Sequence, residues 1–234
     1  QSYTAEGIYS IYTPRISEME GRSKEGETPY ELIKRIEMPI EWHPVLKSYC
    51  DQVGITFCST PFDEKMVDVL ESVNVPFYKV ASYEITHYPM LKKIAQTGKP
   101  TILSTGNSAL DDIERAVNLL EKEGLRDYAL LHCVSQYPAQ YADINLKCLL
   151  TLESAFNCVA GFSDHTTDYL SSVAAVSMGA AIIEKHITMN KEDPGPDHPF
   201  SIEPKELKAF VKAVRATELL LGSSVKCVRK SEEE

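Results

Sequence analysis

The chain has 234 residues, of which 43% are hydrophobic, and its formal net charge is −10 at pH 7. This size suits one large domain or two small ones, and the acidic balance argues against nucleic acid or an anionic membrane surface as the main partner. No apolar run reaches the roughly 18 residues of a membrane span, and the N-terminal residues lack the charged and apolar parts of a signal peptide.

Six cysteines are scattered along the chain without a C-x-x-C motif, and several lie in apolar runs. They are typical of buried free thiols in a reducing compartment such as the cytoplasm, and they do not indicate a disulfide framework. The sequence begins with Gln1 instead of methionine. We therefore expect it to be part of a longer gene product.

The N-terminal quarter shows weak periodicity followed by two helix signals. Residues 1–30 are rich in Tyr, Ser, Thr, Glu and Gly, which predicts a long loop with one helical turn. Thr28 and Pro29 then stand ahead of apolar residues at 32, 33 and 36 and predict a helix start. A second helix is predicted over 42–53.

From residue 54 onward a strand-and-helix pattern occurs six times. The predicted strands are 54–60, 77–82, 100–105, 128–135, 159–164 and 181–187. The helices that follow them are predicted at 63–73, 88–97, 109–123, 145–155, 167–178 and 204–221. Strands that are apolar throughout and alternate with amphipathic helices indicate a parallel sheet covered by helices.

Polar residues gather at the carboxyl end of every predicted strand and in the loop after it. A TIM barrel has its active site on that face, whereas an open doubly wound sheet would gather its polar ends at one switch point. We therefore predict an α/β fold, a TIM (β/α)8 barrel whose first two strands are missing from the chain. The six visible strands would be strands three to eight.

The last two predicted strands each deliver a histidine at this face. His165 follows Ser163 and Asp164, and period-2 alternation puts Glu184 and His186 on one face with Ile182, opposite Ile183, Lys185 and Ile187. Neighbouring strands that carry imidazoles at the same end predict a metal ion held between them. The alternative is two polar strand ends whose histidines bond to protein groups. Asp164 would orient His165 or cap the following helix.

Hydroxyl side chains and one ammonium at the other strand ends predict an anion site. Thr60, Ser82 and Ser104 supply the hydroxyls, although ordinary capping of loops explains any one of them equally well. Lys79 is the sharper signal, because a lysine inside an apolar strand is costly unless it is paired. Glu84 lies near the same end of the predicted barrel. There it would orient a sugar hydroxyl, act as an acid or base, or only pair with Lys79.

The remaining histidines give weaker signals. His132 lies inside a predicted strand and is interpreted as a packing histidine of the barrel interior, with a role in the site as the alternative. His43 and His87 show no partner in the sequence and receive no role.

Several short sequence motifs resemble those of the sialic acid synthase family. This family comprises N-acetylneuraminate synthase and its pseudaminate, legionaminate and spore-coat polysaccharide relatives. The matching words are FCSTPFD (57–63), KVASYEITH (79–87), ILSTGN (102–107), LLHCVSQYPA (130–139), GFSDHT (161–166), IIEKHITMNKEDPGPDH (182–198) and SIEP (201–204). The resemblance runs in order over essentially the whole chain. It implies a TIM barrel that condenses phosphoenolpyruvate with an N-acetylated amino sugar, giving a nine-carbon 2-keto acid and phosphate for surface glycans.

The resemblance also implies roles for individual residues. His165 and His186 would be the ligands of a divalent metal, Mn²⁺ or Mg²⁺, and His186 would act in catalysis with Glu84 and Lys79. Phosphoenolpyruvate would be held by Thr60, Lys79, Ser82, Ser104, Ser163 and Ser135, the last of which stands where several relatives have Asn. The sugar would contact Glu84, Tyr137 and Asp197, and Gln1 resembles the Gln of the family's K-x-Q word. His198 stands where some relatives have an apolar residue.

The chemistry implied by the family is a condensation followed by loss of phosphate. The metal would polarise the aldehyde of the open-chain sugar, and C3 of phosphoenolpyruvate would attack it. Water would then add at C2, and the tetrahedral intermediate would expel phosphate, with fixed donors stabilising the developing charge.

The resemblance further implies a domain organisation. Residues 1–231 would form the N-terminally incomplete catalytic barrel, and 232–234 would begin the linker to an antifreeze-like domain that the chain lacks. In relatives that domain brings an Arg to the partner's sugar site, so we expect a homodimer for the full-length protein. A six-strand piece would leave two sheet edges open, and we expect it to aggregate or to be inactive.

Two other functions compete with this one. A phosphoenolpyruvate-aldol barrel acting on a sugar phosphate would need an Arg/Lys cluster for the second phosphate, and the predicted strand ends carry one Lys. A non-catalytic binding or assembly protein would fit the missing strands, but it would not explain the retention of Lys79, His165 and His186. Residues 3–30 and 137–146 are predicted to select the sugar, which the sequence does not identify.

Overall fold

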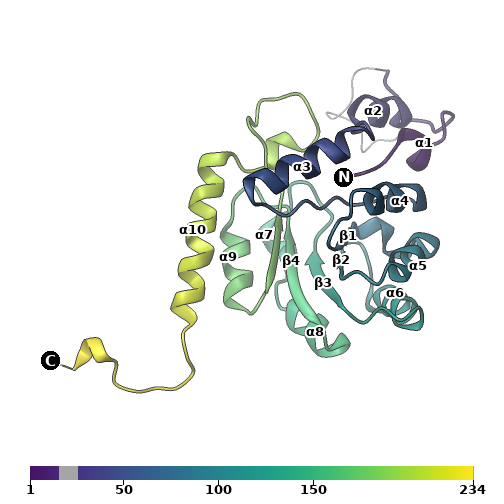
Figure 1. The fold of residues 1–234 in the computed structure, drawn as a ribbon. Coiled ribbons are helices and arrows are strands. Elements are labelled where there is room, and N and C mark those ends of the chain that lie inside the picture. Colours follow the sequence, from purple (N-terminus) through teal and green to yellow (C-terminus); the bar gives the residue numbers. More distant parts are fainter. Residues whose placement is uncertain (16–25, 234) are drawn as a thin grey trace.

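Five parallel strands form one curled sheet in this computed structural model, which describes residues 1–15 and 26–233 (Figure 1). The strands follow each other across the sheet in the order of the chain: β1 (Tyr78–Val80), β2 (Thr101–Ser104), β3 (Tyr128–Cys133), β4 (Val159–Asp164) and β5 (Ile182–Lys185). Strands β1 and β5 are therefore the two edges. The parallel α/β arrangement and the two open edges predicted from the sequence are confirmed, and the sheet is a curled half-barrel.

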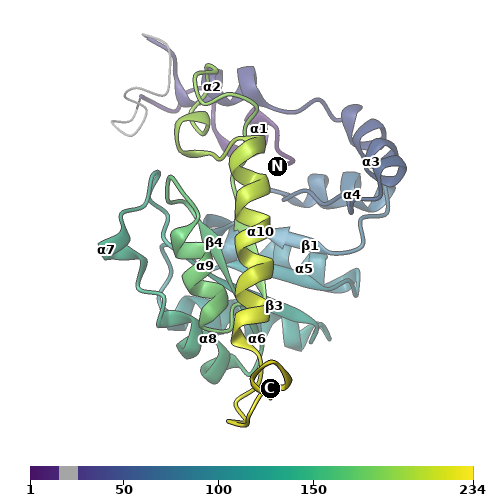
Figure 2. The ribbon, with the colours of Figure 1, turned by 90° about the vertical axis from the view of Figure 1, so that its left-hand side faces the viewer.

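Most helices cover the outer side of the sheet, the first three helices of the chain lie beyond one of its ends, and the long α10 lies alongside α9 (Figures 1 and 2). The helices are α1 (Ala5–Ile8), α2 (Pro29–Ile36), α3 (Trp42–Val53), α4 (Glu64–Ser72), α5 (Tyr88–Gln96), α6 (Leu110–Lys122), α7 (Tyr141–Ile144), α8 (Cys148–Phe156), α9 (Leu170–Ser177) and α10 (Pro204–Leu221). Short 3₁₀ turns lie at Ser82–Thr86, His198–Phe200 and Lys230–Glu232. No helix in the described part of the chain is both long and apolar enough to cross a membrane.

Helix starts follow the capping signals in the sequence. Thr28 accepts a hydrogen bond from the amide of Glu31, whose carboxylate accepts from the amide of Thr28, so α2 begins with a capping box as its sequence predicts. Asp63 opens α4 by accepting from the amide of Met66 at 2.7 Å. Helix α10 begins at Pro204, as predicted from the Pro at its first position.

The main core lies between the sheet and helices α4, α5 and α6. Tyr78, Val80, Leu103 and Leu130 from strands β1 to β3 are buried there. A smaller cluster around the buried Phe162 of β4 lies against α7, α8 and α9. Together they bury the outer face of the sheet, so the concave face and the strand ends remain for a site.

The predicted strand over 54–60 is wrong. This segment forms no ladder, and the nearest bridge joins Ser2 to Pro61, the residue that follows it. The amide of Ser2 donates to the carbonyl of Thr60 at 2.7 Å, and the amide of Phe62 donates to the carbonyl of Ser2 at 3.2 Å. Phe57 is nevertheless buried in the main core. The apolar pattern of this segment therefore predicted the burial of Phe57 correctly, but it did not predict strand pairing correctly.

All six cysteines are free thiols, as predicted. Their burial is less uniform than expected, because Cys133 is buried whereas Cys227 is exposed and the other four are intermediate.

Candidate functional site

A pocket of about 650 Å³ opens at the carboxyl ends of the strands, on the concave face of the sheet. Its polar lining includes six residues from distant parts of the chain: Gln1, Thr60, Lys79, Glu184, His186 and Asp197. Ile102, Leu131 and Ile182 line it from earlier positions in strands β2, β3 and β5. The structure thus brings five of the predicted site residues into one pocket and adds Glu184 to them.

Lys79 is neutralised across the pocket by Glu184. The ammonium donates to the carbonyl of Val80 at 2.9 Å and lies 3.4 Å from Glu184 Oε2, to which Ser104 Oγ also donates at 3.4 Å. The alternative pairing of Lys79 with Glu84 does not form. Burial opposes the charge of Glu184, but the Lys79 ammonium and the hydroxyl of Ser163 more than offset it, so the pKa of Glu184 lies below its usual value.

A second cluster of polar residues surrounds Gly106, just after β2. The amide of Gly106 donates to Ser82 Oγ at 3.0 Å, and a Cβ on Gly106 would collide with Ser135 Oγ. Ser135 Oγ is buried without a hydrogen-bond partner in the described part of the chain. Buried hydroxyls normally find partners, so Ser135 has a donor to offer a bound molecule.

Glu84 lies in the 3₁₀ turn after β1, where its own backbone amide bonds to the carboxylate. Its Oε2 is buried and has no hydrogen-bond partner among the described residues. Burial raises the pKa of Glu84 despite the opposing charges of His87 and Lys79. A carboxylate in this state can hold or release a proton closer to neutral pH than an exposed one.

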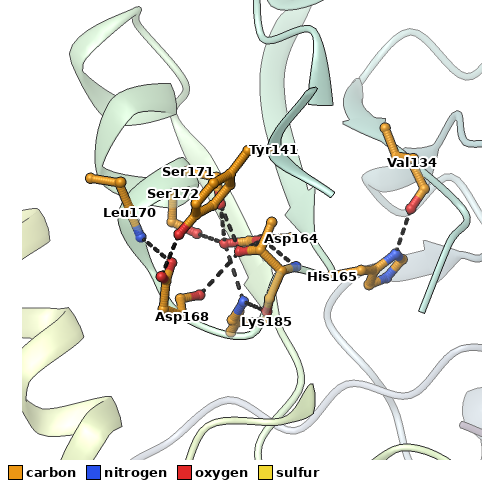
Figure 3. Close-up of polar contacts among 10 residues, drawn as sticks. Val134, Tyr141, Asp164, His165, Asp168, Leu170, Ser171, Ser172 and Lys185 are labelled. Atoms are coloured by element: carbon orange, nitrogen blue, oxygen red, sulfur yellow. Dashed lines mark hydrogen bonds and ion pairs between the residues drawn. The ribbon is translucent and has the colours of Figure 1, made fainter. Parts of the chain in front are cut away.

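His165 follows β4 and has a defined tautomer. Its Nδ1 lies 2.9 Å from the carbonyl oxygen of Val134 (Figure 3). Because a carbonyl only accepts hydrogen bonds, Nδ1 carries a proton, and Nε2 is the nitrogen that a neutral ring would offer to a metal. The ring of Tyr137 lies over His165 with 4.2 Å between centroids, and the His186 ring is 5.3 Å from that of His165.

His186 follows β5 and is held beside Asp197, with 3.6 Å between Nδ1 and Oδ2. Burial lowers the pKa of His186, although Asp197 and Glu184 oppose this shift. The predicted alternation in β5 is confirmed, because Glu184 contacts Lys79 and Ser104, whereas Ile183 packs against the cluster around Phe162 and the Lys185 ammonium bonds to Asp164 and Thr166.

The imidazoles of His165 and His186, whose rings lie 5.3 Å apart, are the two candidate ligands for a divalent cation. Metal-binding histidines commonly donate their second ring nitrogen to a backbone carbonyl, as His165 does to Val134. No group of three or more His, Cys, Asp or Glu side chains in residues 1–15 and 26–233 is arranged as a metal cage. His165 and His186 would therefore leave coordination positions for oxygen atoms of water or substrate, as catalytic sites do.

Two interpretations from the sequence are corrected. His132 does not pack in the barrel interior, because its Nε2 lies 2.6 Å from the carbonyl of Ile144 and its ring stacks on Phe162, on the helix side of the sheet. Asp164 does not cap α9, whose first flanking residue is Tyr169, and it forms no direct bond to His165. It is instead the centre of a buried network with Lys185 (Figure 3).

Sequence reasoning missed two features of the site. His43 is buried and bonds to Ser2 Oγ at 2.7 Å, and Ser2 bonds to Ser59 Oγ at 2.7 Å, which ties α3 to the N-terminal segment that carries Gln1. Cys133 lies 3.9 Å from His165 Nδ1. No local pattern marks these contacts, because the partners are 41, 57 and 32 positions apart.

The predicted specificity segments are partly placed. Tyr3 lines the pocket, and Tyr137 stacks on His165. Residues 16–25, within the first of these segments, lie outside the described residues.

A model of the NeuB family matches residues 1–226. An uncharacterized protein of Methanocaldococcus jannaschii is 49% identical over 203 residues, which is 87% of this chain and 60% of that protein. The N,N'-diacetyllegionaminic acid synthase of Campylobacter jejuni is 38% identical over 235 residues, which is all of this chain and 70% of that protein. The chain therefore spans about three fifths to seven tenths of these relatives' lengths.

Solved structures agree with this similarity. The N-acetylneuraminic acid synthetase of Leptospira borgpetersenii, in complex with citrate, superposes with a TM-score of 0.85 at 33% identity, covering 100% of this chain and 76% of that one. A truncated 3-deoxy-D-arabino-heptulosonate 7-phosphate synthase of Thermotoga maritima gives a TM-score of 0.66 at 13% identity, covering 79% of this chain and 72% of that one. The second likeness shows a shared fold alone.

Proposed function

The chain belongs to the NeuB family, and from that premise we propose that it serves a synthase that condenses phosphoenolpyruvate with an N-acetylated amino sugar. The products would be a nine-carbon 2-keto sugar acid and phosphate. The acceptor would be N-acetylmannosamine or a di-N-acetylated 6-deoxy hexose. Homodimer formation through a further domain stays a prediction.

The observation that carries this proposal is the composition of the pocket. It combines one ammonium paired with a carboxylate, the hydroxyl of Thr60 and the imidazole of His186, and the ring of His165 lies 5.3 Å from that of His186. Phosphoenolpyruvate carries a phosphate and a carboxylate, which suit charge-assisted bonds from Lys79 and hydroxyl donors such as Ser135. Two relatives named N,N'-diacetyllegionaminic acid synthase share 38% and 40% identity over 100% and 97% of this chain.

Different side chains around the pocket would serve different parts of the reaction. Lys79, Ser82, Ser104 and the amide groups near Gly106 would hold phosphoenolpyruvate, so that its C3 faces the sugar. Thr60, Ser163 and Gln1 would complete this binding surface. When bound between His165 and His186, Mn²⁺ or Mg²⁺ would polarise the sugar's aldehyde as a Lewis acid.

The sugar would be held on the opposite side of the pocket. Asp197 presents a carboxylate beside His186, and the Tyr137 ring offers an apolar face next to His165. Glu84, whose pKa is raised by burial, would exchange a proton with a sugar hydroxyl or with the water that adds at C2. The overall reaction then balances: C3 bonds to the aldehyde carbon, the water adds at C2, and phosphate leaves from C2.

A synthase acting on a sugar phosphate is disfavoured by the charges in the pocket. Such a substrate carries a second phosphate, which needs further cations. Lys79 is paired with Glu184, and Lys185, the other lysine at the pocket, is paired with Asp164. The likeness to the heptulosonate phosphate synthase is one of fold and does not bear on substrate.

Phosphate release from phosphoenolpyruvate tests the proposal. The purified protein would be incubated with Mn²⁺ or with EDTA, in the presence of N-acetylmannosamine or of each di-N-acetylated 6-deoxy hexose. Metal-dependent release with one sugar would support the synthase and identify its acceptor. An absence of release with every sugar, from folded and Mn²⁺-loaded protein, would overturn it in favour of a binding role.

His165→Ala gives a sharper form of this test. We expect turnover to fall at least a hundredfold while circular dichroism shows an intact fold, because one of the two candidate ligands is lost. His87→Asn is a matched control, since it removes an imidazole that caps α5 and does not line the pocket. Full activity of His165→Ala would contradict the metal assignment.

A further inference from the structure

Asp164 and Lys185 form a buried ion pair at the ends of two adjacent strands. They are the last residues of β4 and β5 and are direct partners in the register of the sheet. Lys185 Nζ lies 3.3 Å from Asp164 Oδ2, and the two side chains are only 3% and 0% exposed. A charged pair this deeply buried costs several kcal/mol of desolvation per ion unless its hydrogen bonds are satisfied.

A dense set of donors offsets that cost around Asp164 (Figure 3). Thr166 donates its amide at 2.8 Å and its hydroxyl at 2.7 Å to Oδ1. Ser171 and Ser172, in the first turn of α9, donate their hydroxyls to Oδ2. Lys185 in turn donates to the carbonyl of Thr166. The network therefore joins the end of β4, the end of β5 and the start of α9 into one unit.

This unit lies directly before both candidate metal ligands. His165 follows Asp164 in the chain, and His186 follows Lys185. The pair fixes the lateral distance between the two strand ends at the level where the chain turns into the site. The two imidazole rings lie 5.3 Å apart, a separation that depends on the positions of these strand ends.

We propose that the Asp164–Lys185 ion pair is a positioning element that holds His165 and His186 at the separation needed to share one divalent cation. The proposal rests on the function proposed above, because that function supplies the cation. The ion pair does not touch the metal and acts through the backbone of β4 and β5. A buried charge pair suits this task because it tolerates little displacement without exposing an uncompensated charge.

Metal binding by folded variants tests the role. Asp164→Asn and Lys185→Met each remove one charge with little change of shape, and the double variant removes both and leaves the net charge unchanged. The dissociation constant for Mn²⁺ would be measured from the electron paramagnetic resonance signal of free Mn²⁺. The visible spectrum of bound Co²⁺ would report the ligand geometry, and thermal unfolding would report stability.

We expect each single variant to bind Mn²⁺ about tenfold more weakly or worse, as substitutions behind metal ligands usually do. The double variant should recover thermal stability relative to the singles, since it leaves no unpaired buried charge. It should nevertheless keep the weakened Mn²⁺ affinity and an altered Co²⁺ spectrum, because the tie between the strands is absent. Lys99→Met is the control, because Lys99 pairs with Glu71 outside the pocket at 2.6 Å.

Three results would overturn the proposal. Wild-type Mn²⁺ affinity and Co²⁺ spectrum in the folded variants would show that the pair does not position the histidines. If the double variant recovers both stability and Mn²⁺ affinity, the ion pair contributes only to stability. If the wild type does not bind Mn²⁺, there is no metal for the ion pair to position ligands around. If the single variants fail to fold, the double variant and the milder Ser172→Ala carry the same comparison. Wild-type Mn²⁺ binding without phosphate release would contradict the proposed function alone.

Discussion

Two carboxylates near the pocket, Glu84 and Glu184, have pKa values shifted in opposite directions. Burial works against the charge of both, but Glu184 has the Lys79 ammonium and the Ser163 hydroxyl beside it and its pKa is lowered. Glu84 has a buried oxygen without a partner in the described part of the chain, and its pKa is raised. Pairs of titratable groups with opposed shifts commonly divide the acid or base role from the electrostatic one. We therefore assign proton transfer to Glu84 and charge compensation to Glu184.

The raised pKa of Glu84 makes a prediction about stability. Between the ordinary carboxyl pKa of about 4.3 and the raised value, the folded state binds more protons than the unfolded state, so stability falls as pH rises. Glu84→Gln removes the charge and should raise the free energy of unfolding at pH 7 by about 1 kcal/mol, the scale of one buried acceptor left without a partner. The gain should become small near pH 4, where Glu84 is mostly protonated in both states.

Urea unfolding at a series of pH values would measure this difference. Glu114→Gln, at an exposed position on α6, is the control and should show no such pH dependence. The Glu84 variant should also lose phosphate release, because the group that costs stability is assigned to proton transfer. A stability gain that is equal at pH 4 and pH 7 would refute the electrostatic explanation.

At the scale of single residues, the sequence indicated candidate site residues but not the residues to which they bond. Lys79, His165 and His186 stood out because polar side chains inside or at the ends of apolar strands are costly unless they are used, whereas Asp197 was indicated only by the family resemblance. The pairing of Lys79 with Glu184 and the bond of His43 to Ser2 join positions that are far apart in the chain. Such pairings depend on the register and curl of the sheet, which no local pattern contains.

Among the elements, β4 carries a glycine where it contacts both its neighbours. A Cβ added to Gly161 would lie 2.5 Å from the carbonyl oxygen of Ile182 on β5 and 2.5 Å from Leu131 on β3. Backbone cannot move aside as a flexible side chain can, so Gly161→Ala must displace β5. We expect it to lower the free energy of unfolding by about 1 to 3 kcal/mol, as overpacking does.

Gly106→Ala makes a matched comparison, because the same methyl group would there meet the side-chain oxygens of Ser135 and Ser82. We expect that variant to keep most of its stability but to raise the KM for phosphoenolpyruvate at least tenfold. Denaturant titration and steady-state kinetics on both variants would separate the two effects. A Gly161→Ala protein as stable as the wild type would contradict the close approach of β4 and β5.

Elements were predicted well where local pattern and tertiary structure agree. Strand β4 and helix α10 have the predicted bounds, because one is apolar throughout and the other has a clear start and a long amphipathic repeat. The segment 54–60 was predicted as a strand on the same apolar pattern, but it joins no ladder, and its contact with the N-terminal segment is the hydrogen bond from the amide of Ser2 to the carbonyl of Thr60. Hydrophobic periodicity reports which residues are buried, whereas a strand also requires a partner at the right distance.

For the molecule as a whole, the order of the sheet implies a gradient of local stability. Strand β3 is paired on both sides, and its Leu130 and Leu131 are fully buried, whereas β1 and β5 are edges. Amide hydrogens should therefore exchange slowest in β3 and at least tenfold faster in β1 and β5. Hydrogen–deuterium exchange read by mass spectrometry would show this gradient.

The same experiment examines the open edges. Addition of Mn²⁺ should slow exchange at the end of β5, because ligand binding stabilises the segment that carries His186. Protection of β5 equal to that of β3 in the metal-free protein would mean that its outer edge is paired in solution, and would contradict the open half-barrel.

The agreement between the order of strands in the sheet and their order in the chain also bears on synthesis at the ribosome. Each strand pairs with the next one to be made, so the contacts that build the sheet are local along the chain. At roughly 5 to 20 residues per second, β1 and β2 can associate seconds before β5 has emerged. The strands that precede His165 and His186 come last, and the growing sheet therefore acquires its two imidazoles only after the rest of the half-barrel is in place.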